Sequence, residues 1–548
     1  MKTDSIARIT NRNGCVGNLA KQPREHETDL TGRDRLVSNV IFNWVGHLVF
    51  IIAGFIMPRM IDRRLGQELL GIWDFGWSLV SYFNMVEAGI SGAVSRYVAK
   101  YRAAGDVAAV NQILSAGSCI LGIAGMLVLG LTIGLVLLLP GLFGSRLGEN
   151  VYDAQWAIFF LGTSMAVQIS MAAYGGVLTG CHRWALKNFI ESGWHAATVT
   201  CMIVTLLMGG GLTSLAAIAC TGIFFTYATT VVLAYRVFDG LSFQLYLVQW
   251  SVIKDLYVFG GKSLVPMVSR MLLNQTTSVL IIAYLGPAML ALYSRPRALI
   301  LHVDKLVQQM ARVLTPTTSS LLYSKSFEEI RELLIQSTRY GLYMVLPIVS
   351  MLVVFGGTII ELWMGPHYSN GWIPALLAIG FFIPISQAPA MRILVGLNAH
   401  GRPGMADFLA SICSAGLVLF MLAYLKLGLA GVAVAITTPL TLVYAIYQPF
   451  LVSRQLDIHV RSYLLSATLR PAILVLPFAI CLIIAKVVFA ASPWVGLVAG
   501  GTAGGLVLSI LYWRYALPER IKDWISRGLR RALRATGFRT TADAALDN

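Results

Sequence analysis

Stretches of about 20 consecutive apolar residues recur along almost the whole of this 548-residue chain. A helix of that length rises about 1.5 Å per residue and crosses the roughly 30 Å hydrocarbon core of a membrane. The stretches are continuous rather than alternating, which favours helices over the strands of a membrane barrel. About fourteen spans are predicted, at approximately 38–60, 68–94, 112–139, 154–178, 187–208, 212–236, 256–284, 287–312, 339–362, 372–397, 404–425, 429–452, 466–489 and 494–515.

The chain also repeats itself weakly at a constant offset of 220 positions. The offset carries short segments onto related ones, namely 65–66 onto 285–286, 70–73 onto 290–293, and 110–114 onto 330–334. Internal repeats are a mark of transporter folds, in which the substrate site lies between two related bundles. The sequence therefore predicts that helices 1–6 and 7–12 are related by a roughly two-fold rotation about the membrane normal.

These patterns predict an all-α integral membrane protein with two pseudo-symmetric six-helix lobes around a central cavity. The predicted parts are a polar cytoplasmic N-terminal tail (1–37), a first lobe (38–245), a second lobe (246–452), an extra transmembrane helix pair (453–516) and a basic amphipathic cytoplasmic segment (517–548). In the last segment basic residues surround one apolar helical face, made of Ile521, Trp524, Ile525, Leu529 and Leu533. This pattern is typical of a helix on an anionic membrane surface, and a solvated basic tail is the alternative.

The net charge of +16 raises the question of a nucleic-acid partner, but the distribution of charge argues against one. Only 12% of the residues are charged, against about 25% in soluble domains. With the N-terminus inside, most of the 42 Lys and Arg fall on the tails and the even-numbered loops. The odd-numbered loops carry few, namely Arg59, Arg63, Arg64, Arg146 and Lys426. This asymmetry predicts that both termini lie in the cytoplasm.

The sequence does not support an enzyme, a metal site or a cofactor. The seven cysteines stand singly, without a Cys-x-x-Cys pair or a Cys/His cluster. Residues 261–263 resemble the end of a phosphate-binding loop, but position 256 is Leu rather than the required Gly. The longest internal loops, near 313–338 and 237–255, are short for a catalytic domain. Energy is therefore expected from an ion gradient, a substrate gradient or a partner.

The segment from Asn43 to Asp106 carries a recognisable series of motifs. These are Pro58, the runs 65–66, 70–73 and 87–97, Lys100, Tyr101, Arg102, Gly105 and Asp106, with the run 314–316 as a second-half counterpart. In these motifs the chain resembles the polysaccharide transporter family, the O-antigen flippases and their relatives, within the multidrug/oligosaccharidyl-lipid/polysaccharide (MOP) exporter superfamily. The general pattern covers roughly residues 38–452.

The resemblance implies two six-helix lobes that work by alternating access. It implies movement of a polyprenyl-diphosphate-linked sugar from the cytoplasmic to the outer leaflet of the cell inner membrane. The lipid II flippase of the same superfamily also has two helices beyond twelve, but its cationic residues are not found at matching positions in the first two helices. An exported polysaccharide or O-antigen unit is therefore the expected substrate, with membrane lipids and other polysaccharide-assembly membrane proteins as further expected partners.

A flippase must carry a charged headgroup through hydrocarbon, which requires a wet cationic cavity. Arg270, with Asn274 one turn further on, lies near the middle of the seventh span, and both are predicted to line the cavity. The planar guanidinium of Arg270 suits phosphate oxygens and makes it the leading candidate, with a pair to an intramembrane acid as the alternative. In the eighth span one helical stripe holds Arg295, His302 and Gln309, flanked by Lys305, and carries no acid. The opposite stripe holds Arg297, Asp304 and Gln308 and mixes the two signs. The stripe with Arg295 and His302 is predicted to line the cavity. The stripe with Arg297 and Asp304 is a further candidate for the site, but its mixed charges suit a structural ion-pair face between helices. A purely structural role for both stripes is the alternative.

The first lobe adds further candidates. Asn43 and His47 share a face of the first span and are predicted to line the cavity. Four acids, Asp74, Glu87, Glu191 and Asp304, are candidates for coupling to a cation or for balancing the arginines. An ordinary structural role is the alternative for each of them.

Two other functions compete with a flippase. A cation-coupled drug or metabolite antiporter of the same superfamily would need buried acids in the first span, and none lies between Val40 and Pro58. A membrane-embedded transferase would need clustered His, Asp and Glu at the membrane surface, which the sequence does not show.

Overall fold

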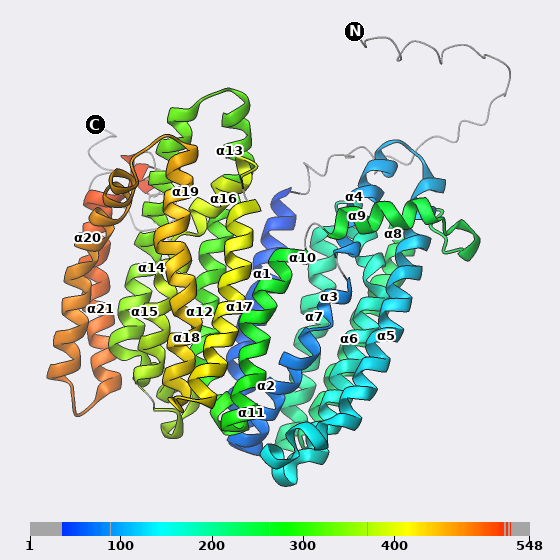
Figure 1. Ribbon diagram of the computed structural model, residues 1–548, viewed down its shortest axis with the longest axis horizontal. Coiled ribbons are helices and arrows are strands. Elements are labelled where there is room, and N and C mark those ends of the chain that lie inside the picture. Colours follow the sequence, from blue (N-terminus) through cyan, green and yellow to red (C-terminus); the bar gives the residue numbers. More distant parts are fainter. Residues whose placement is uncertain are drawn as a thin grey trace, which may run out of the picture.

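The structure is a computed structural model that describes residues 36–87, 89–261, 264–369, 371–399, 401–519, 522–523 and 526–527. Throughout these residues the chain is helical, and no strand occurs among them. The long helices form two bundles that meet at one end and spread apart at the other, which is the end where the first helix begins at Leu36 (Figure 1). This fold agrees with the all-α membrane architecture predicted from the sequence.

The first bundle, called the first lobe, consists of eight helices. They are α1 (Leu36–Leu65), α2 (Gln67–Ser81), α3 (Asn84–Glu87), α4 (Ile90–Ala103), α5 (Val107–Leu147), α6 (Val151–Gly180), α7 (Trp184–Leu207) and α8 (Leu212–Val237). Small residues let the helices approach closely. A side chain at Gly125 of α5 would meet the backbone of Ala166 of α6, and one at Gly176 of α6 would meet the backbone of Ser91 of α4.

The amphipathic helix α9 (Trp250–Gly261) leads from the first lobe to the second. The second lobe consists of α10 (Leu264–Met271), the π-helical turn η4 (Leu272–Thr276), α11 (Thr277–Leu285), α12 (Pro287–Ala311), α13 (Leu314–Tyr323), α14 (Phe327–Met364), α15 (Trp372–Ser386), α16 (Ala388–Gly396), α17 (Gly401–Ala423), α18 (Gly428–Leu442), the π-helical turn η6 (Val443–Tyr447) and α19 (Gln448–Gln455). A short 3-10 turn, η5 (Pro366–Tyr368), joins α14 to α15.

The backbone repeats at the offset read from the sequence. Helices α1 and α11 end at Leu65 and Leu285, 220 positions apart. The glycines that follow have nearly the same conformation, with φ 91° and ψ 168° at Gly66 and φ 88° and ψ 173° at Gly286. A positive φ of this kind favours glycine. The repeat therefore extends from the residue pattern to the backbone.

Further along the chain the offset falls to 216. Helices α6 and α16 end at Gly180 and Gly396, and the turns after them place His182 at φ 58° and Asn398 at φ 56°. The shift follows largely from one helix pair, because α5 has 41 residues and its counterpart α14 has 38. Both lobes thus share one order of helices and turns, which is slightly shorter in the second lobe over this stretch.

Two more helices, α20 (Val460–Val488) and α21 (Pro493–Leu511), lie outside the two lobes and pack on α14 (Figure 1). The Tyr512 hydroxyl, just after α21, donates to the Tyr343 carbonyl oxygen at 2.8 Å. Lys486 Nζ of α20 donates to the Val354 carbonyl oxygen at 2.6 Å. The extra pair is therefore attached to the second lobe through α14.

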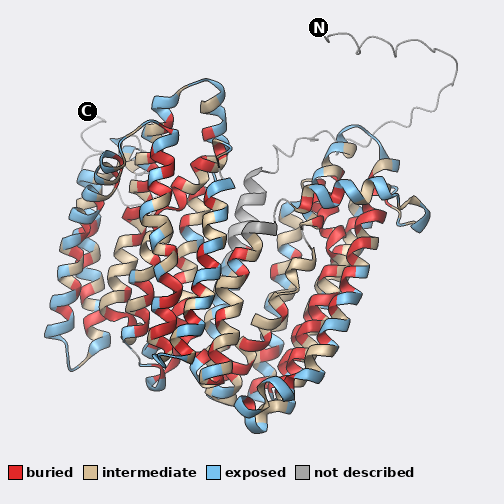
Figure 2. Ribbon diagram, viewed as in Figure 1, coloured by how far each residue is buried: buried red, intermediate tan, exposed pale blue. Residues whose placement is uncertain are grey.

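Burial follows the pattern expected of a membrane protein. Buried residues run along the centre of each bundle, and exposed ones face outwards (Figure 2). Large apolar side chains are exposed on outer faces, for example Met126 at 75%, Leu137 at 72% and Ile510 at 66%. Helices that are apolar all round suit a hydrocarbon environment.

Each predicted span overlaps a helical stretch, and nine stretches of the described residues are long and apolar enough to cross a membrane. Helix α12 is not among them, because it carries Arg295, Arg297, Asp304 and Lys305. The number of fourteen crossings and the five predicted part boundaries stay predictions. The N-terminal tail and the proposed apolar face at 521–533 lie outside the described residues.

Candidate functional site

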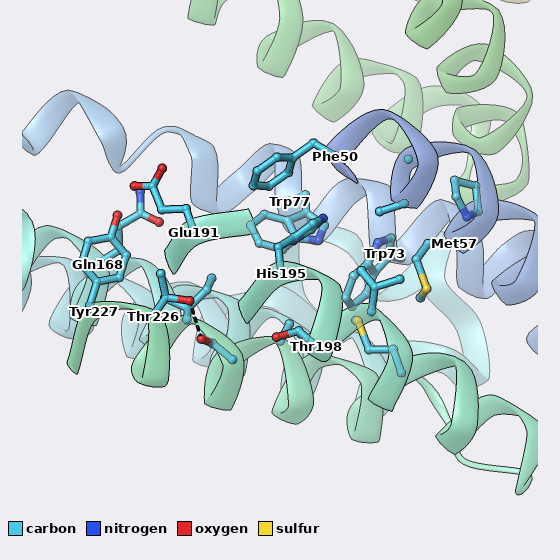
Figure 3. A pocket seen from close by; sticks show the side chains of 18 of the residues that line it. Phe50, Met57, Trp73, Trp77, Gln168, Glu191, His195, Thr198, Thr226 and Tyr227 are labelled. Atoms are coloured by element: carbon cyan, nitrogen blue, oxygen red, sulfur yellow. Dashed lines mark hydrogen bonds between the residues drawn. The ribbon is translucent and has the colours of Figure 1, made fainter. Parts of the chain in front are cut away.

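A cavity of about 610 Å³ lies within the first lobe and reaches the second. Helices α1, α2, α6, α7 and α8 build most of its wall, and α12 of the second lobe contributes His302 and Lys305. Figure 3 shows many of its side chains in close view. Because both lobes border this space, a change in their relative position would change its shape.

Aromatic rings form one part of the wall. Phe50 of α1 stacks on His195 of α7 with 4.2 Å between ring centroids. Trp73 and Trp77, one turn apart on α2, meet edge to face at 6.0 Å. The close-up shows Phe50, Trp77 and His195 gathered on one side of the cavity (Figure 3). These rings offer flat apolar faces whose edges can still make polar contacts.

Polar side chains gather at the other end of the cavity. Gln168, Glu191 and Tyr227 lie together there, away from Trp73 and Met57 (Figure 3). Lys187 Nζ lies 2.7 Å from Glu191 Oε1, one helical turn earlier on α7. Glu191 is therefore balanced by a neighbouring cation.

The second lobe contributes two of the predicted cavity residues. His302 and Lys305 lie one turn apart on α12, and both line the cavity. The Lys305 side chain is exposed to the open space, and the His302 ring stacks on Phe55 of α1 at 5.7 Å. These are two of the residues grouped on the predicted acid-free stripe.

Arg295 occupies a different place from the predicted one. It is only 5% exposed and forms an ion pair and hydrogen bond with Asp74 of α2. In this structure Arg295 is therefore paired across the lobes, and its part in lining a cavity stays a prediction. The stripe of α12 that holds Arg295 carries no acid of its own. The acid that balances Arg295 is Asp74, which lies on α2 of the first lobe.

Arg297 and Asn274 pack inside the second lobe. Arg297 is 8% exposed, its Nη2 donates to Asn274 Oδ1 at 2.8 Å, and its guanidinium lies 4.0 Å from the centre of the Phe381 ring. Asn274 lies in the π-helical turn η4. Arg297 and Asn274 thus contact each other inside the second lobe and are not among the residues that line the cavity described above, so their part in substrate binding stays a prediction.

Arg270 is exposed on α10, and its carbonyl oxygen accepts a hydrogen bond from Asn274 Nδ2 at 2.8 Å. Asp304 lies within electrostatic range of Arg270, Arg297 and Arg392. Gln308 links these groups, because its Nε2 lies 3.5 Å from Asp304 Oδ1 and its Oε1 accepts from Arg392 Nη2 at 3.0 Å. Asp304 thus belongs to a mixed-charge network of the second lobe.

Three predicted candidates lie elsewhere. Asn43 and His47 belong to α1, but their side chains lie outside the described part of the structure. Glu87, at the end of α3, is half-buried and within electrostatic range of Lys187 and Tyr227. Across the described residues, no group of three or more His, Cys, Asp or Glu could hold a metal ion.

The two lobes are joined at the end opposite the start of α1 (Figure 1). The Trp363 indole nitrogen donates to the Phe55 carbonyl oxygen at 2.7 Å, and the Tyr368 hydroxyl donates to Asp62 Oδ1 at 2.6 Å. Burial, reinforced by the hydrogen bond to Asp62, raises the pKa of Tyr368 well above its ordinary value. The hydroxyl therefore stays protonated and keeps donating across the interface.

Helices α2 and α12 cross at the same end. Gln67 Nε2 donates to the Ala288 carbonyl oxygen at 3.0 Å. Gly71 packs directly on the backbone of Pro287, so that an added Cβ would lie only 3.0 Å from the Pro287 Cα and closer still to its carbonyl group. With the Asp74–Arg295 pair, these contacts close one end of the space between the lobes.

The sequence interpretation missed the aromatic wall. Trp73 and Trp77 share one helical face at i, i+4 spacing, and His195 is a polar ring within an apolar span. Those signals are present in the sequence. Nothing in it shows that Phe50 from another helix completes the group.

Comparison with known proteins gives the same fold and points to one family. The model of the family described as "Polysaccharide biosynthesis protein" matches residues 190–372. The "Putative O-antigen transporter" of Shigella flexneri is 23% identical over 414 residues, which cover 73% of this chain and 94% of that protein.

Two solved structures share the arrangement of helices. An inward-facing multidrug resistance MATE family transporter of the MOP superfamily superposes with a TM-score of 0.64 at 17% identity, covering 75% of this chain and 94% of that one. The lipid II flippase MurJ in an inward closed conformation superposes with a TM-score of 0.62 at 13% identity, covering 87% and 99%. At these sequence identities the two structures show only that the fold is shared. The family model and the O-antigen transporter show similarity in sequence. The chain is thus similar in sequence to a polysaccharide biosynthesis family and to an O-antigen transporter, and it shares its fold with these two transporters.

Proposed function

We propose that this protein is a flippase that moves a polyprenyl-diphosphate-linked oligosaccharide, a polysaccharide or O-antigen repeat unit, across the cytoplasmic membrane by alternating access. The observation that carries the proposal is the cavity of about 610 Å³, which is lined by helices of the first lobe and by α12 of the second lobe. The likeness to an O-antigen transporter and to a lipid II flippase supports the same class of substrate.

The chemistry of the cavity suits a sugar headgroup. The C–H faces of a pyranose are apolar and carry a slight positive charge, so they stack well on the negative faces of rings such as Trp77 and His195. Its hydroxyls can form hydrogen bonds with Gln168, Thr226 and Tyr227. The prenyl chain needs no polar site, because it can stay in the hydrocarbon of the bilayer.

The contacts between the lobes suit alternating access. The lobes are joined at one end by the Asp74–Arg295 and Asp62–Tyr368 contacts and are spread apart at the other (Figure 1). With both termini in the cytoplasm, the spread end faces the cytoplasm. A substrate that stabilises a state closed at both ends lowers the free energy of passing from one open state to the other.

A deletion strain tests the proposal. Removal of the gene should cause a lipid-linked oligosaccharide to accumulate on the cytoplasmic side, and mass spectrometry of the extracted lipids would identify the sugar. The intact gene should reverse the accumulation. If the strain accumulates no such lipid, or if purified protein in liposomes does not speed its transbilayer movement, the proposal is wrong.

A cation-coupled drug or metabolite antiporter is the second candidate. The aromatic wall and Glu191 would suit an organic cation, but Glu191 is paired with Lys187 at 2.7 Å and Lys305 adds positive charge. Efflux of a cationic dye by the purified protein, without movement of lipid-linked sugar, would favour this alternative. The same fold relationship and the lack of a catalytic cluster in the sequence support a transporter rather than an enzyme.

A further inference from the structure

The two lobes present different chemistry to the space between them. The first lobe presents the aromatic wall, with Glu191 and its partner Lys187 at one end. The second lobe presents Lys305 from α12, and the exposed Arg270 and Arg312 lie on or beside its helices. The rings of the first lobe and Lys305 of the second lobe thus border the same cavity.

The basic surface of the second lobe has an excess of positive charge. Arg392 lies within electrostatic range of both Arg270 and Arg312, which repel it. Asp304 is shared among Arg270, Arg297 and Arg392, so its one negative charge is divided between three guanidinium groups. Like charges held this close are costly unless an anion joins them.

Residues at equivalent positions of the internal repeat have different surroundings in the two lobes. Helices α2 and α12 start after equivalent glycines, so Trp77 and Arg297, 220 positions apart, occupy equivalent helical positions. Trp77 borders the first-lobe cavity, whereas Arg297 is buried against the Phe381 ring and Asn274. A ring that faces open space in one lobe is replaced by a guanidinium inside the other.

A second equivalent pair shows the same divergence. An acid on α7 and a tyrosine on α8, Glu191 and Tyr227, border the open cavity. In the second lobe Asp407 of α17, 216 positions after Glu191, accepts a hydrogen bond at 2.9 Å from the hydroxyl of Tyr444, which lies in the π-helical turn η6, 217 positions after Tyr227. In the second lobe the acid and the tyrosine therefore bind each other, whereas in the first lobe the corresponding side chains border the cavity.

We propose that the two lobes divide the substrate between them, with the aromatic wall of the first lobe binding the sugars and the basic wall of the second lobe, chiefly Arg270 and Lys305, binding the diphosphate. This inference rests on the proposed flippase function and deepens it. Glu191 and Lys187 balance each other at the polar end of the cavity and leave no net charge for an anion, whereas charge-assisted hydrogen bonds from Arg and Lys of the second lobe attract one. Lys305 borders the cavity itself, so the diphosphate and the first sugar can lie next to each other.

The division has a mechanical consequence. A headgroup that contacts both walls binds most strongly when the walls are close together, and it therefore favours closing of the lobes. A lipid that carries the diphosphate without a sugar contacts one wall and lacks this effect. It should bind to the protein but should not be carried efficiently across the membrane.

Two probes and four variants of the purified full-length protein test the division. The probes are radiolabelled polyprenyl diphosphate without sugar and the same lipid carrying an oligosaccharide. Arg270→Gln and Lys305→Gln should each weaken binding of both probes about tenfold, as loss of a charge-assisted hydrogen bond predicts. Trp77→Ala and His195→Ala should weaken binding of the sugar-bearing probe about tenfold and change binding of the sugar-free probe less than about twofold.

Arg236→Gln serves as a matched control, because Arg236 is an exposed cation at the end of α8 in the first lobe, outside the cavity wall. It should bind both probes like the unaltered protein. Arg270→Lys should keep part of the affinity, which separates loss of charge from misfolding.

The inference is overturned if Trp77→Ala weakens binding of the sugar-free probe as much as Arg270→Gln does, or if Arg270→Gln and Lys305→Gln weaken neither. If the unaltered protein still moves the lipid-linked sugar in liposomes, only the division of labour has failed. If the unaltered protein binds neither probe, the flippase proposal has failed as well.

Discussion

The buried ion pair between Asp74 and Arg295 should act as a latch between the lobes, and Asp74→Asn should release it. The two side chains are 17% and 6% exposed. In the variant, Arg295 would stay buried without a negative partner for as long as this end of the molecule is closed. When the lobes part there, the same guanidinium reaches water. The substitution therefore penalises the closed state specifically.

The magnitude follows from the burial. Removal of one partner of a buried ion pair costs about 3–5 kcal/mol, and the partial exposure of Asp74 places this pair near the lower value. Since about 1.4 kcal/mol corresponds to a tenfold change in an equilibrium constant, about 3 kcal/mol shifts the ratio of closed to open states roughly a hundredfold. A ratio of roughly 99:1 would become about 1:1.

Spin labels can measure this shift. Cysteines replacing Arg146 and Tyr424 would carry them, because both residues are exposed at the joined end. Arg146 lies in the last turn of α5, and Tyr424, which is 77% exposed, follows α17. The native cysteines would be replaced by serine. In Asp74→Asn the distances between the labels should shift towards longer values, and Glu149→Gln, an exposed acid at the same end, should leave them unchanged. Identical distance distributions in Asp74→Asn and the parent would refute the latch.

Three further predictions concern export, topology and packing. Arg270→Ala should abolish export while the protein stays in the membrane, and Arg270→Lys should restore part of it; normal export by Arg270→Ala would contradict a role for this basic wall. Reporter fusions at Gly210 and Asp457 should report opposite sides of the membrane, and the same side for both would overturn the predicted topology. Gly71→Ala should push α12 away from α2 and lower the melting temperature, whereas Gly92→Ala, with open space around it, should not; equal melting temperatures would show that the close approach is unimportant.

The sequence by itself determined the class of fold and much of its symmetry. Long apolar stretches leave little choice but helices, since backbone groups in hydrocarbon must pair within their own segment. The offset of 220 positions located the equivalent turns at Gly66 and Gly286, because only glycine readily adopts their positive φ. Helical periodicity placed His302 on one stripe of its helix with Lys305 beside it, and the structure puts both at the cavity.

Only the tertiary structure decided which charges are available. Helical periodicity describes the face of one helix, so it could not show that Asp74, more than 200 residues away, pairs with Arg295. Nor could it show that Phe381 covers Arg297, or that Phe50 and His195 stack across two helices to build the wall of the cavity. A side chain's role in a membrane cavity depends on what the neighbouring helices place opposite it, and that arrangement is set by packing between distant segments.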